Sequence, residues 1–174
     1  MIRPILRYGD RVLHQRAAEV VTFDDNLQRL IDDMIETMYA APGIGLAAIQ
    51  VGVPKRLLVI DLQEEEDGEG KPIRQPRVFI NPEILDESDQ LQVYSEGCLS
   101  IPDQYADVER PATIRARWQD REGNLHEEDL EGLLAICLQH EMDHLEGVLF
   151  IDHLSRLKRE MVLKKLAKLR QKAA

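Results

Sequence analysis

The sequence lacks long apolar runs, has only two cysteines, and has few aromatic residues, at 5% of the chain. No stretch approaches the roughly 18 consecutive apolar residues that a membrane span requires, so we expect no membrane partner. The start, Met1–Pro4, is not followed by an apolar core and a small-residue cleavage site. We therefore predict neither a secretory signal nor an organelle-targeting extension, and expect a cytoplasmic protein.

Cysteine content and charge narrow the possible partners. Cys98 and Cys137 allow at most one disulfide, and in an intracellular chain a metal-binding or buried thiol is expected instead. The net charge of −10 argues against binding to DNA. The charge is uneven, because eight basic residues and a single acidic one, Glu160, lie between Ser155 and the end of the chain. Such a basic segment is typical of a contact surface for an acidic partner.

The length of 174 residues, 44% of them hydrophobic, suits one domain with a buried core. We see no repeat or linker and predict a single domain over residues 1–174, with an extended N-terminal arm over residues 1–22. Asp24 and Asp25 are suited to cap a helix that begins near Asn26 and stops before Pro42. Its apolar residues have the spacing of a core-facing helical stripe: Leu27, Leu30, Ile31, Met34, Ile35 and Met38.

Short apolar runs predict strands further along the chain. An acidic, glycine-containing segment, residues 63–75, follows the first run and is predicted to be a solvated loop. Residues 113–119 alternate in polarity, and turn residues 120–124 lead into a second strand, which predicts an antiparallel hairpin. The remaining predicted strands are Leu57–Leu62, Val78–Asn81 interrupted by Pro82, and Leu91–Tyr94.

Two further helices complete the predicted fold. A central helix over about 131–145 has apolar flanks, and Gly147 suits its C-terminal stop. A final helix over about 154–171 has an apolar stripe opposite its basic face. The stripe consists of Leu154, Leu157, Met161, Val162, Leu166 and Leu169. This order of elements predicts an α+β domain with antiparallel or mixed sheets around the central helix.

The strongest chemical signal lies in the central helix, where residues 140–144 read His-Glu-x-x-His. Residues i and i+4 of a helix share one face, so His140 and His144 can both reach one metal ion. Glu141 is poorly placed to be a ligand but close enough to accept a proton from water at the metal. A chance match on a surface helix is the alternative, and the apolar flanks argue against it.

The residues alone leave the third metal ligand open, although a catalytic metal of this kind usually has three protein ligands. Phe150 stands where one class of metallopeptidase has a third histidine, and it cannot bind metal. Glu160 would suit another class but lies in a basic, surface-like helix. Cys98, next to Gly97 at a strand end, is equally compatible with a zinc or iron ligand and with a buried thiol. Cys137 fits packing in the central helix better.

Three stretches together resemble the three motifs of bacterial peptide deformylases: Gly43–Gln50, Glu96–Ser100 and Gln139–Gly147. They occur in the family's order and at its approximate spacing, and nearly the whole chain fits. The resemblance implies a metal-dependent hydrolase that removes the N-formyl group from the formylmethionine of newly made polypeptides and releases formate. It implies Fe²⁺ as the native ion, with Zn²⁺, Ni²⁺ or Co²⁺ as replacements.

The resemblance also implies roles for individual residues of the metal site. It makes Cys98, His140 and His144 the metal ligands, and Glu141 the catalytic acid and base. For the basic final helix it implies docking to the ribosome, close to nascent peptides. An ordinary amphipathic helix that covers the core is the equally weighted alternative.

Further roles implied by the resemblance concern the substrate. The side-chain amide of Gln50 and the backbone N–H of Leu99 would stabilise the oxyanion, and Gly45 would lie against the substrate backbone. Ile49 and Tyr105 depart from residues common in the family, and Tyr105 stands where many members have arginine. The pocket for the methionine side chain would include Ile44, Glu96, Leu133, Ile136, Cys137 and His140.

Two rival functions stay open at this point. A metallopeptidase that cleaves internal peptide bonds would be favoured by a third ligand other than Cys98. A non-catalytic binding protein with the same fold is disfavoured by the complete set of Gln50, Cys98 and Glu141.

Overall fold

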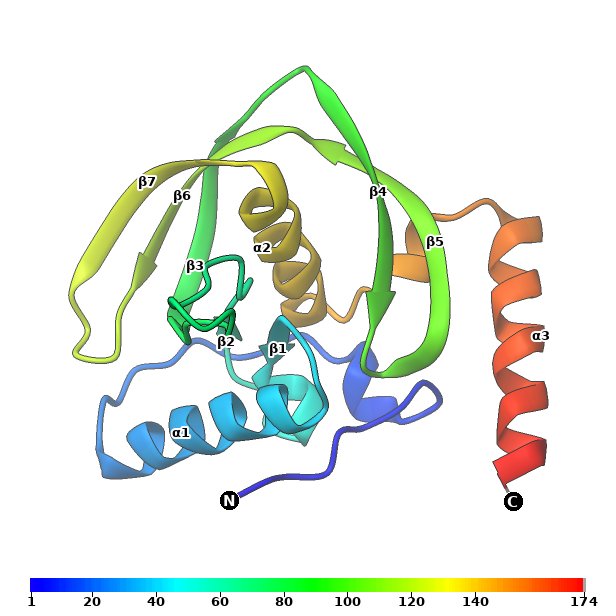
Figure 1. Cartoon of the computed structure of the whole chain (residues 1–174), viewed down its shortest axis with the longest axis horizontal. Coiled ribbons are helices and arrows are strands. Elements are labelled where there is room, and N and C mark those ends of the chain that lie inside the picture. The colour runs from blue at the N-terminus through cyan, green and yellow to red at the C-terminus, as the bar shows by residue number, and fades with distance from the viewer. Residues whose placement is uncertain (174) are drawn as a thin grey trace.

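Helix α2 (Gly132–Leu145), which carries the His-Glu-x-x-His sequence, passes through the middle of the molecule in the computed structural model (Figure 1). Nine of its 14 residues are buried, including both histidines and the glutamate, so the prediction of a buried helix is confirmed. The structure describes residues 1–173. Residue 174, the last of the predicted domain, lies outside the described residues.

The prediction of an α+β fold is also confirmed, with the strands in two antiparallel sheets. The larger sheet has the order β1-β2-β3-β6-β7, and β4 and β5 form a separate two-stranded ribbon. All of the paired strands within residues 1–173 run antiparallel. Besides α2, the elements are η1 (Arg11–His14), α1 (Asp25–Ala40), β1 (Gly45–Ala47), η2 (Ala48–Val51), β2 (Leu57–Ile60), β3 (Arg77–Glu87), β4 (Leu91–Cys98), β5 (Ile101–Pro111), β6 (Thr113–Gln119), β7 (Leu125–Glu131), η3 (Phe150–His153) and α3 (Arg156–Ala173).

Helix α2 lies between the larger sheet and the β4–β5 ribbon (Figure 1). On the sheet side, Leu58, Phe79 and Trp118 belong to the same buried cluster as Ala135 and Leu138 of α2. On the other side the ribbon arches past the helix. The His-Glu-x-x-His sequence is therefore enclosed between two sheets, and its two histidines and its glutamate are buried.

The amphipathic helix α1 has the predicted cap. Asp24 accepts a hydrogen bond from the backbone N–H of Leu27 at 3.0 Å, which satisfies a free donor of the first turn. The predicted stripe is buried, apart from Ile35, which is partly buried. The arm before this helix is not fully extended as predicted. It contains η1, because Asp10 caps that turn through the N–H of Val12 at 3.0 Å.

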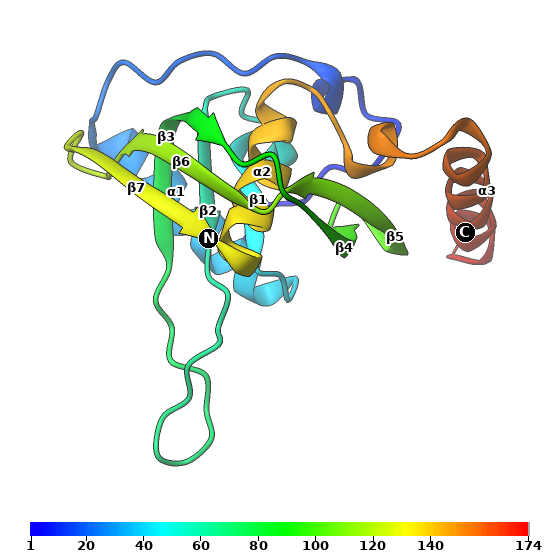
Figure 2. The ribbon, with the colours of Figure 1, turned by 90° about the horizontal axis from the view of Figure 1, so that it is seen from above.

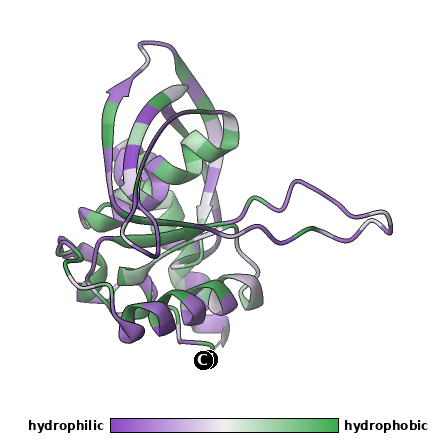
Figure 3. Cartoon of the chain, turned by 90° about the vertical axis from the view of Figure 1, so that its left-hand side faces the viewer, coloured by the Kyte–Doolittle hydropathy of each residue, from purple (hydrophilic) through white to green (hydrophobic). Residues whose placement is uncertain are grey.

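The hairpin predicted from residue 113 onward, with its turn at residues 120–124, is confirmed as β6 and β7. The side chains on one face of β6 are buried, whereas Arg115 and Arg117 on the other face form ion pairs with acids of neighbouring strands. The acidic segment between β2 and β3 forms a long loop that projects from the body of the molecule (Figure 3). Strand β2 ends two residues earlier than predicted, because the Asp61 carboxylate instead accepts hydrogen bonds from the N–H groups of Gln63 and Gln75 at the base of this loop.

The predicted break at Pro82 is wrong, since β3 continues through it to Glu87. The pairing of β3 with β6 shifts register between Ile80 and Glu83, so Asn81 and Pro82 occupy a bulge. A bulge does not need the N–H that proline lacks, and Asn81 takes up the local strain at a φ of 51°.

Strand β4 is longer than predicted, reaching Cys98, and β5 was not predicted at all. The apolar residues of β5 do not alternate regularly, because the buried face contains Gln104 and Arg110 beside Val108. Its pairing with β4 also shifts register next to Gly97. A search for apolar alternation therefore misses this strand.

Helix α3 stands at the side of the molecule, next to β5 and η3 (Figure 2). Its predicted stripe is only half right. Val162 and Leu166 are buried, but Leu157 and Met161 are 69% and 52% exposed. The helix touches the body along one narrow face, so part of the stripe faces away from it. Within residues 1–173, no helix is both long and apolar enough to cross a membrane.

Gly147 ends α2 as predicted. It also provides a test of the contact between the end of α2 and the N-terminal arm. Its φ is +75°, and an added Cβ would lie 2.5 Å from the backbone oxygen of His14. A left-handed conformation alone costs an L-residue roughly 1–2 kcal/mol, and the contact adds to it. We expect Gly147→Ala to lower the free energy of unfolding in urea by at least about 2 kcal/mol.

Gly68→Ala is the matched control, because a Cβ there meets nothing within 4 Å. It should change the free energy of unfolding by less than about 0.5 kcal/mol. Equal effects of the two substitutions would contradict the proposed contact between the end of α2 and the N-terminal arm.

Candidate metal centre and active site

Three side chains from two elements form a group that could hold a metal ion. His140 and His144 lie one turn apart on α2, and Cys98 ends β4. Their candidate ligand atoms all lie within 4.8 Å of one another, and Cys98 Sγ is 3.4 Å from His144 Nε2. Glu160, by contrast, is exposed on α3, where it pairs with Arg156. Of the ligands weighed from the sequence, the structure brings Cys98 to the histidines.

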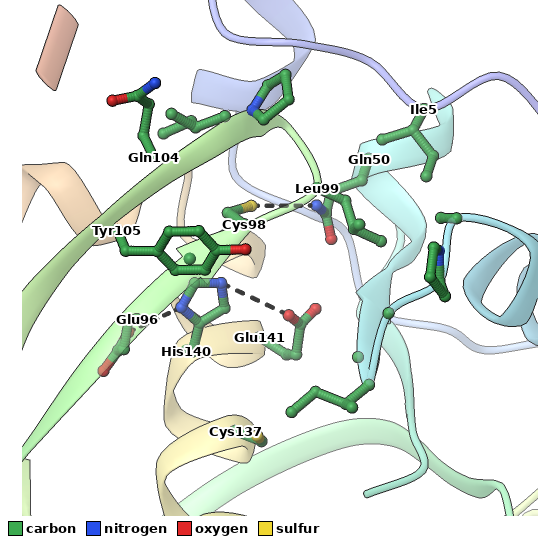
Figure 4. Close-up of a pocket in the computed structure, with 18 of the residues that line it drawn as sticks. Ile5, Gln50, Glu96, Cys98, Leu99, Gln104, Tyr105, Cys137, His140 and Glu141 are labelled. Atoms are coloured by element: carbon green, nitrogen blue, oxygen red, sulfur yellow. Dashed lines mark hydrogen bonds and ion pairs between the residues drawn. The ribbon is translucent and has the colours of Figure 1, made fainter. Parts of the chain in front are cut away.

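The orientation of His140 is fixed by a buried carboxylate. Its Nδ1 lies 2.8 Å from Oε1 of Glu96, so Nε2 faces the site on the side of Glu141 (Figure 4). Burial alone would raise the pKa of Glu96, but hydrogen bonds from Arg110 and His140 outweigh it and lower that pKa. Glu96 therefore remains an anionic acceptor. Such a partner sets the tautomer and the ring orientation of a metal-binding histidine.

Arg110 and Asp143 belong to this arrangement and were not identified from the sequence. Arg110 donates two hydrogen bonds to Glu96, at 2.6 and 2.9 Å, and a third to Asp143 at 2.8 Å. The Asp143 carboxylate also lies 2.8 Å from His153 Nε2. One signal for such a partner was available in the sequence. The resemblance placed Glu96 in an otherwise apolar pocket, and a buried carboxylate requires a cationic partner.

Glu141 follows His140 on α2 and is also buried. It is 5% exposed, and its Oε1 is 3.7 Å from His140 Nε2. Its Oε2 is buried without a hydrogen-bond partner among the described residues. Burial raises the pKa of Glu141 to about 7, which suits a group that accepts and returns a proton near neutral pH. A Cβ on Gly45 would lie 3.2 Å from this carboxyl group, so glycine keeps the space beside it open.

The side chain of Gln50 is held on both sides. Its Oε1 accepts a hydrogen bond from the backbone N–H of Ala47 at 2.9 Å. Its Nε2 donates to Ser100 Oγ at 3.1 Å and lies 3.4 Å from Cys98 Sγ (Figure 4). Leu99 lies in the two-residue turn between β4 and β5, next to Cys98. Two candidate oxyanion donors thus come to the same place from η2 and from this turn.

One cavity of about 850 Å³ joins these groups, and all of the predicted site residues except His144 line it. His144 is fully buried behind the wall. Burial raises the pKa of Cys137 to about 12, so its thiol stays protonated and acts as part of an apolar wall. Of the two departures, Ile49 is buried in the core, whereas Tyr105 is 69% exposed and lines the mouth of the cavity over Gly97.

The sequence model of the polypeptide deformylase family matches residues 2–160. The chain belongs to the peptide deformylase family. It is 71% identical to the peptide deformylase of Rhizorhabdus wittichii, over 98% of this chain and 96% of that protein. It is 68% identical to that of Zymomonas mobilis, over 97% and 94% of the two chains.

Solved peptide deformylases share the fold. The structure from Legionella pneumophila matches with a TM-score of 0.90 and 45% identity, over 98% of this chain and 96% of that one. The structure from Synechococcus elongatus, in complex with actinonin, matches with a TM-score of 0.86 and 46% identity, over 94% and 86%. Peptide deformylases are metal-dependent hydrolases that remove the N-formyl group from nascent peptides, and this activity is that of the present chain.

The ion pairs of Arg110 allow a direct test of what supports the site. Arg110→Met would leave the buried carboxylate of Glu96 without its cation, a change that typically costs about 3–5 kcal/mol. We expect a loss of that size in the free energy of unfolding, measured with urea. Arg117→Met, which breaks an exposed pair with Glu83, should cost less than about 1 kcal/mol. A similar loss of unfolding free energy in both variants would show that the buried pairs of Arg110 stabilise the protein no more than an exposed pair does.

Proposed function

We propose that this peptide deformylase holds one Fe²⁺ with Cys98, His140 and His144, and that Glu141 moves the proton during deformylation. The observation that supports these roles best is that Cys98, His140 and Glu141 line one cavity, with His144 directly behind Cys98 and His140. Among the described residues, Glu141 Oε2 has no hydrogen-bond partner there. We further propose that residues 1–174 act as one catalytic domain in the cytoplasm.

The donor set fits the proposed metal. One thiolate and two imidazoles suit Fe²⁺, Zn²⁺, Ni²⁺ and Co²⁺. The hydrogen bond between Glu96 and His140 is of the kind that orients a histidine ligand toward its metal. Among these ions we propose Fe²⁺, because the chain resembles deformylases in all three motifs. When bound, the ion supplies Lewis acidity toward the formyl oxygen and toward water.

The protein groups provide the proton transfer and the charge stabilisation. Glu141 accepts a proton at Oε2 from the water that attacks the formyl carbon. It then delivers this proton to the departing amine nitrogen, which yields formate and a free N-terminus. The Gln50 amide and the Leu99 backbone N–H donate to the oxyanion that develops, and the loss of one such donor typically costs about 10²–10³ in rate.

The cavity suits a formylmethionyl substrate. Its apolar wall accepts the methionine side chain at Ile44, Leu133, Ile136 and Cys137. The narrow space between Gly45 and Glu141 favours formyl, the smallest acyl group, over acetyl. Equal cleavage of N-formyl and N-acetyl peptides would contradict this part of the proposal.

The decisive experiment measures formate released from formyl-Met-Ala-Ser by protein purified without oxygen, with metal content determined on the same sample. We expect turnover with about one metal per chain. Glu141→Ala should keep the metal and lose about 10²–10⁴ in kcat, because the proton acceptor is gone. Full activity in Glu141→Ala would contradict the proposed acid and base.

The same sample separates the rival functions. Cys98→Ala should lose the metal, whereas Cys137→Ala, the matched control on α2, should retain it. Retention of metal in Cys98→Ala would point to a different third ligand and to a metallopeptidase-like site. Metal without any turnover would favour a non-catalytic protein.

We also propose that helix α3 docks on the ribosome. Its basic side chains Lys164, Lys165 and Lys168 are exposed, and Leu157 and Met161 lie exposed on the same helix. A mixed basic and apolar helix suits a surface that contains RNA and protein. Coverage of the core by Val162 and Leu166 is a second role of the helix and does not use these exposed residues.

Charge reversal tests the docking without disturbing the core, whereas truncation after Lys164 would remove the buried Leu166. We expect Lys164→Glu/Lys168→Glu to weaken co-sedimentation with ribosomes at least about tenfold, because two attractive contacts become repulsive. The control Lys55→Glu/Lys71→Glu makes the same charge change at exposed positions away from α3. Unchanged binding in the α3 variant would reject the docking.

A further inference from the structure

We propose that Ser100 is a positioning residue that aims the side-chain amide of Gln50 into the active site. The inference rests on the proposed role of Gln50 as an oxyanion donor. Ser100 stands two residues after Cys98, in the turn between β4 and β5, and it is fully buried. Its hydroxyl oxygen lies 3.1 Å from Gln50 Nε2.

The contacts of Gln50 determine which way its amide faces. The backbone N–H of Ala47 can only donate, so the atom 2.9 Å away must be the carbonyl oxygen of the amide. The NH₂ group therefore faces the opposite way, toward the β4–β5 turn. This assignment depends on a backbone donor and not on the serine itself.

The two hydrogens of Nε2 then have different partners. One is donated to Ser100 Oγ at 3.1 Å, and the other points toward Cys98 Sγ at 3.4 Å, a weak acceptor (Figure 4). Because Ser100 takes up the first hydrogen, rotation of the amide is restricted. The second hydrogen stays directed at the space beside Cys98, where the oxyanion would form.

The backbones of both residues are held by the same segment of the N-terminal arm. The N–H of Leu6 donates to the carbonyl of Gln50 at 2.7 Å, and the N–H of Tyr8 donates to the carbonyl of Ser100 at 2.8 Å. This arm therefore fixes η2 and the β4–β5 turn relative to each other. With both backbones fixed, the hydroxyl of Ser100 is a stable reference point for the Gln50 side chain.

A purely structural role for Ser100 makes a different prediction. Loss of a packing contact or of a buried hydrogen bond would reduce stability and act on the rate independently of Gln50. A positioning role acts through Gln50 and is needed when negative charge develops on the substrate. It therefore affects kcat and leaves KM nearly unchanged.

The test is a double-mutant cycle on the metal-loaded enzyme with formyl-Met-Ala-Ser. We expect Ser100→Ala to lower kcat by about 10- to 100-fold, with KM within about twofold and the metal content unchanged. Gln50→Ala should lower kcat by about 10²–10³. In the Gln50→Ala background, Ser100→Ala should have an effect of less than about twofold, because its target is gone.

Ser100→Thr keeps a hydroxyl acceptor and should restore most of the kcat lost in Ser100→Ala, which supports the proposal even if the alanine variant folds poorly. The proposal would be overturned if Ser100→Ala lowered kcat equally in the wild-type and Gln50→Ala backgrounds. It would also be overturned if Ser100→Ala did not lower kcat in the wild-type background. If Gln50→Ala itself keeps full activity, the proposed oxyanion role fails and this inference fails with it. If Gln50→Ala lowers kcat but Ser100→Ala does not, only the positioning role of Ser100 is rejected.

Discussion

The carboxylate of Glu96 is the group on which the arrangement of the site depends. It is buried between a histidine of α2 and an arginine of β5, and it accepts hydrogen bonds from both. Burying a carboxylate is costly unless it is fully paired. Removal of any one of Glu96, Arg110 and His140 would therefore leave a buried polar group without its partner. Because the three residues come from β4, β5 and α2, this pairing also fixes the ribbon against the central helix.

The remaining groups of the site use the same framework. Cys98 lies two residues after Glu96 on β4, and the turn that follows provides Leu99 and Ser100. Strand alternation places Glu96 and Cys98 on the same side of β4, toward α2. A single short hairpin thus carries the residue that orients His140, the third candidate ligand and two residues beside the proposed oxyanion site.

Some of this could be predicted from the sequence and some could not. Local patterns indicated the helices, the β6–β7 hairpin and the pair His140 and His144, because periodicity and i, i+4 spacing act within one element. The third ligand stayed open until the family's motifs were considered, since no local pattern shows that β4 ends beside α2. Arg110 was missed for a related reason. Its importance comes from Glu96, a partner 14 residues away on β4. Arg110 itself breaks the apolar alternation of its own strand, β5, so that strand was not predicted either.

The N-terminal arm has a consequence for how the chain acquires its structure. The N–H of Ala17 bonds the carbonyl of Leu145, and Leu6 and Tyr8 bond residues 50 and 100. These contacts join the first part of the chain to segments made much later, and long loops must close before they form. During synthesis the bond of Ala17 therefore cannot form until the end of α2 has left the ribosome. The enzyme that trims nascent chains must itself be nearly complete before its own catalytic site can assemble.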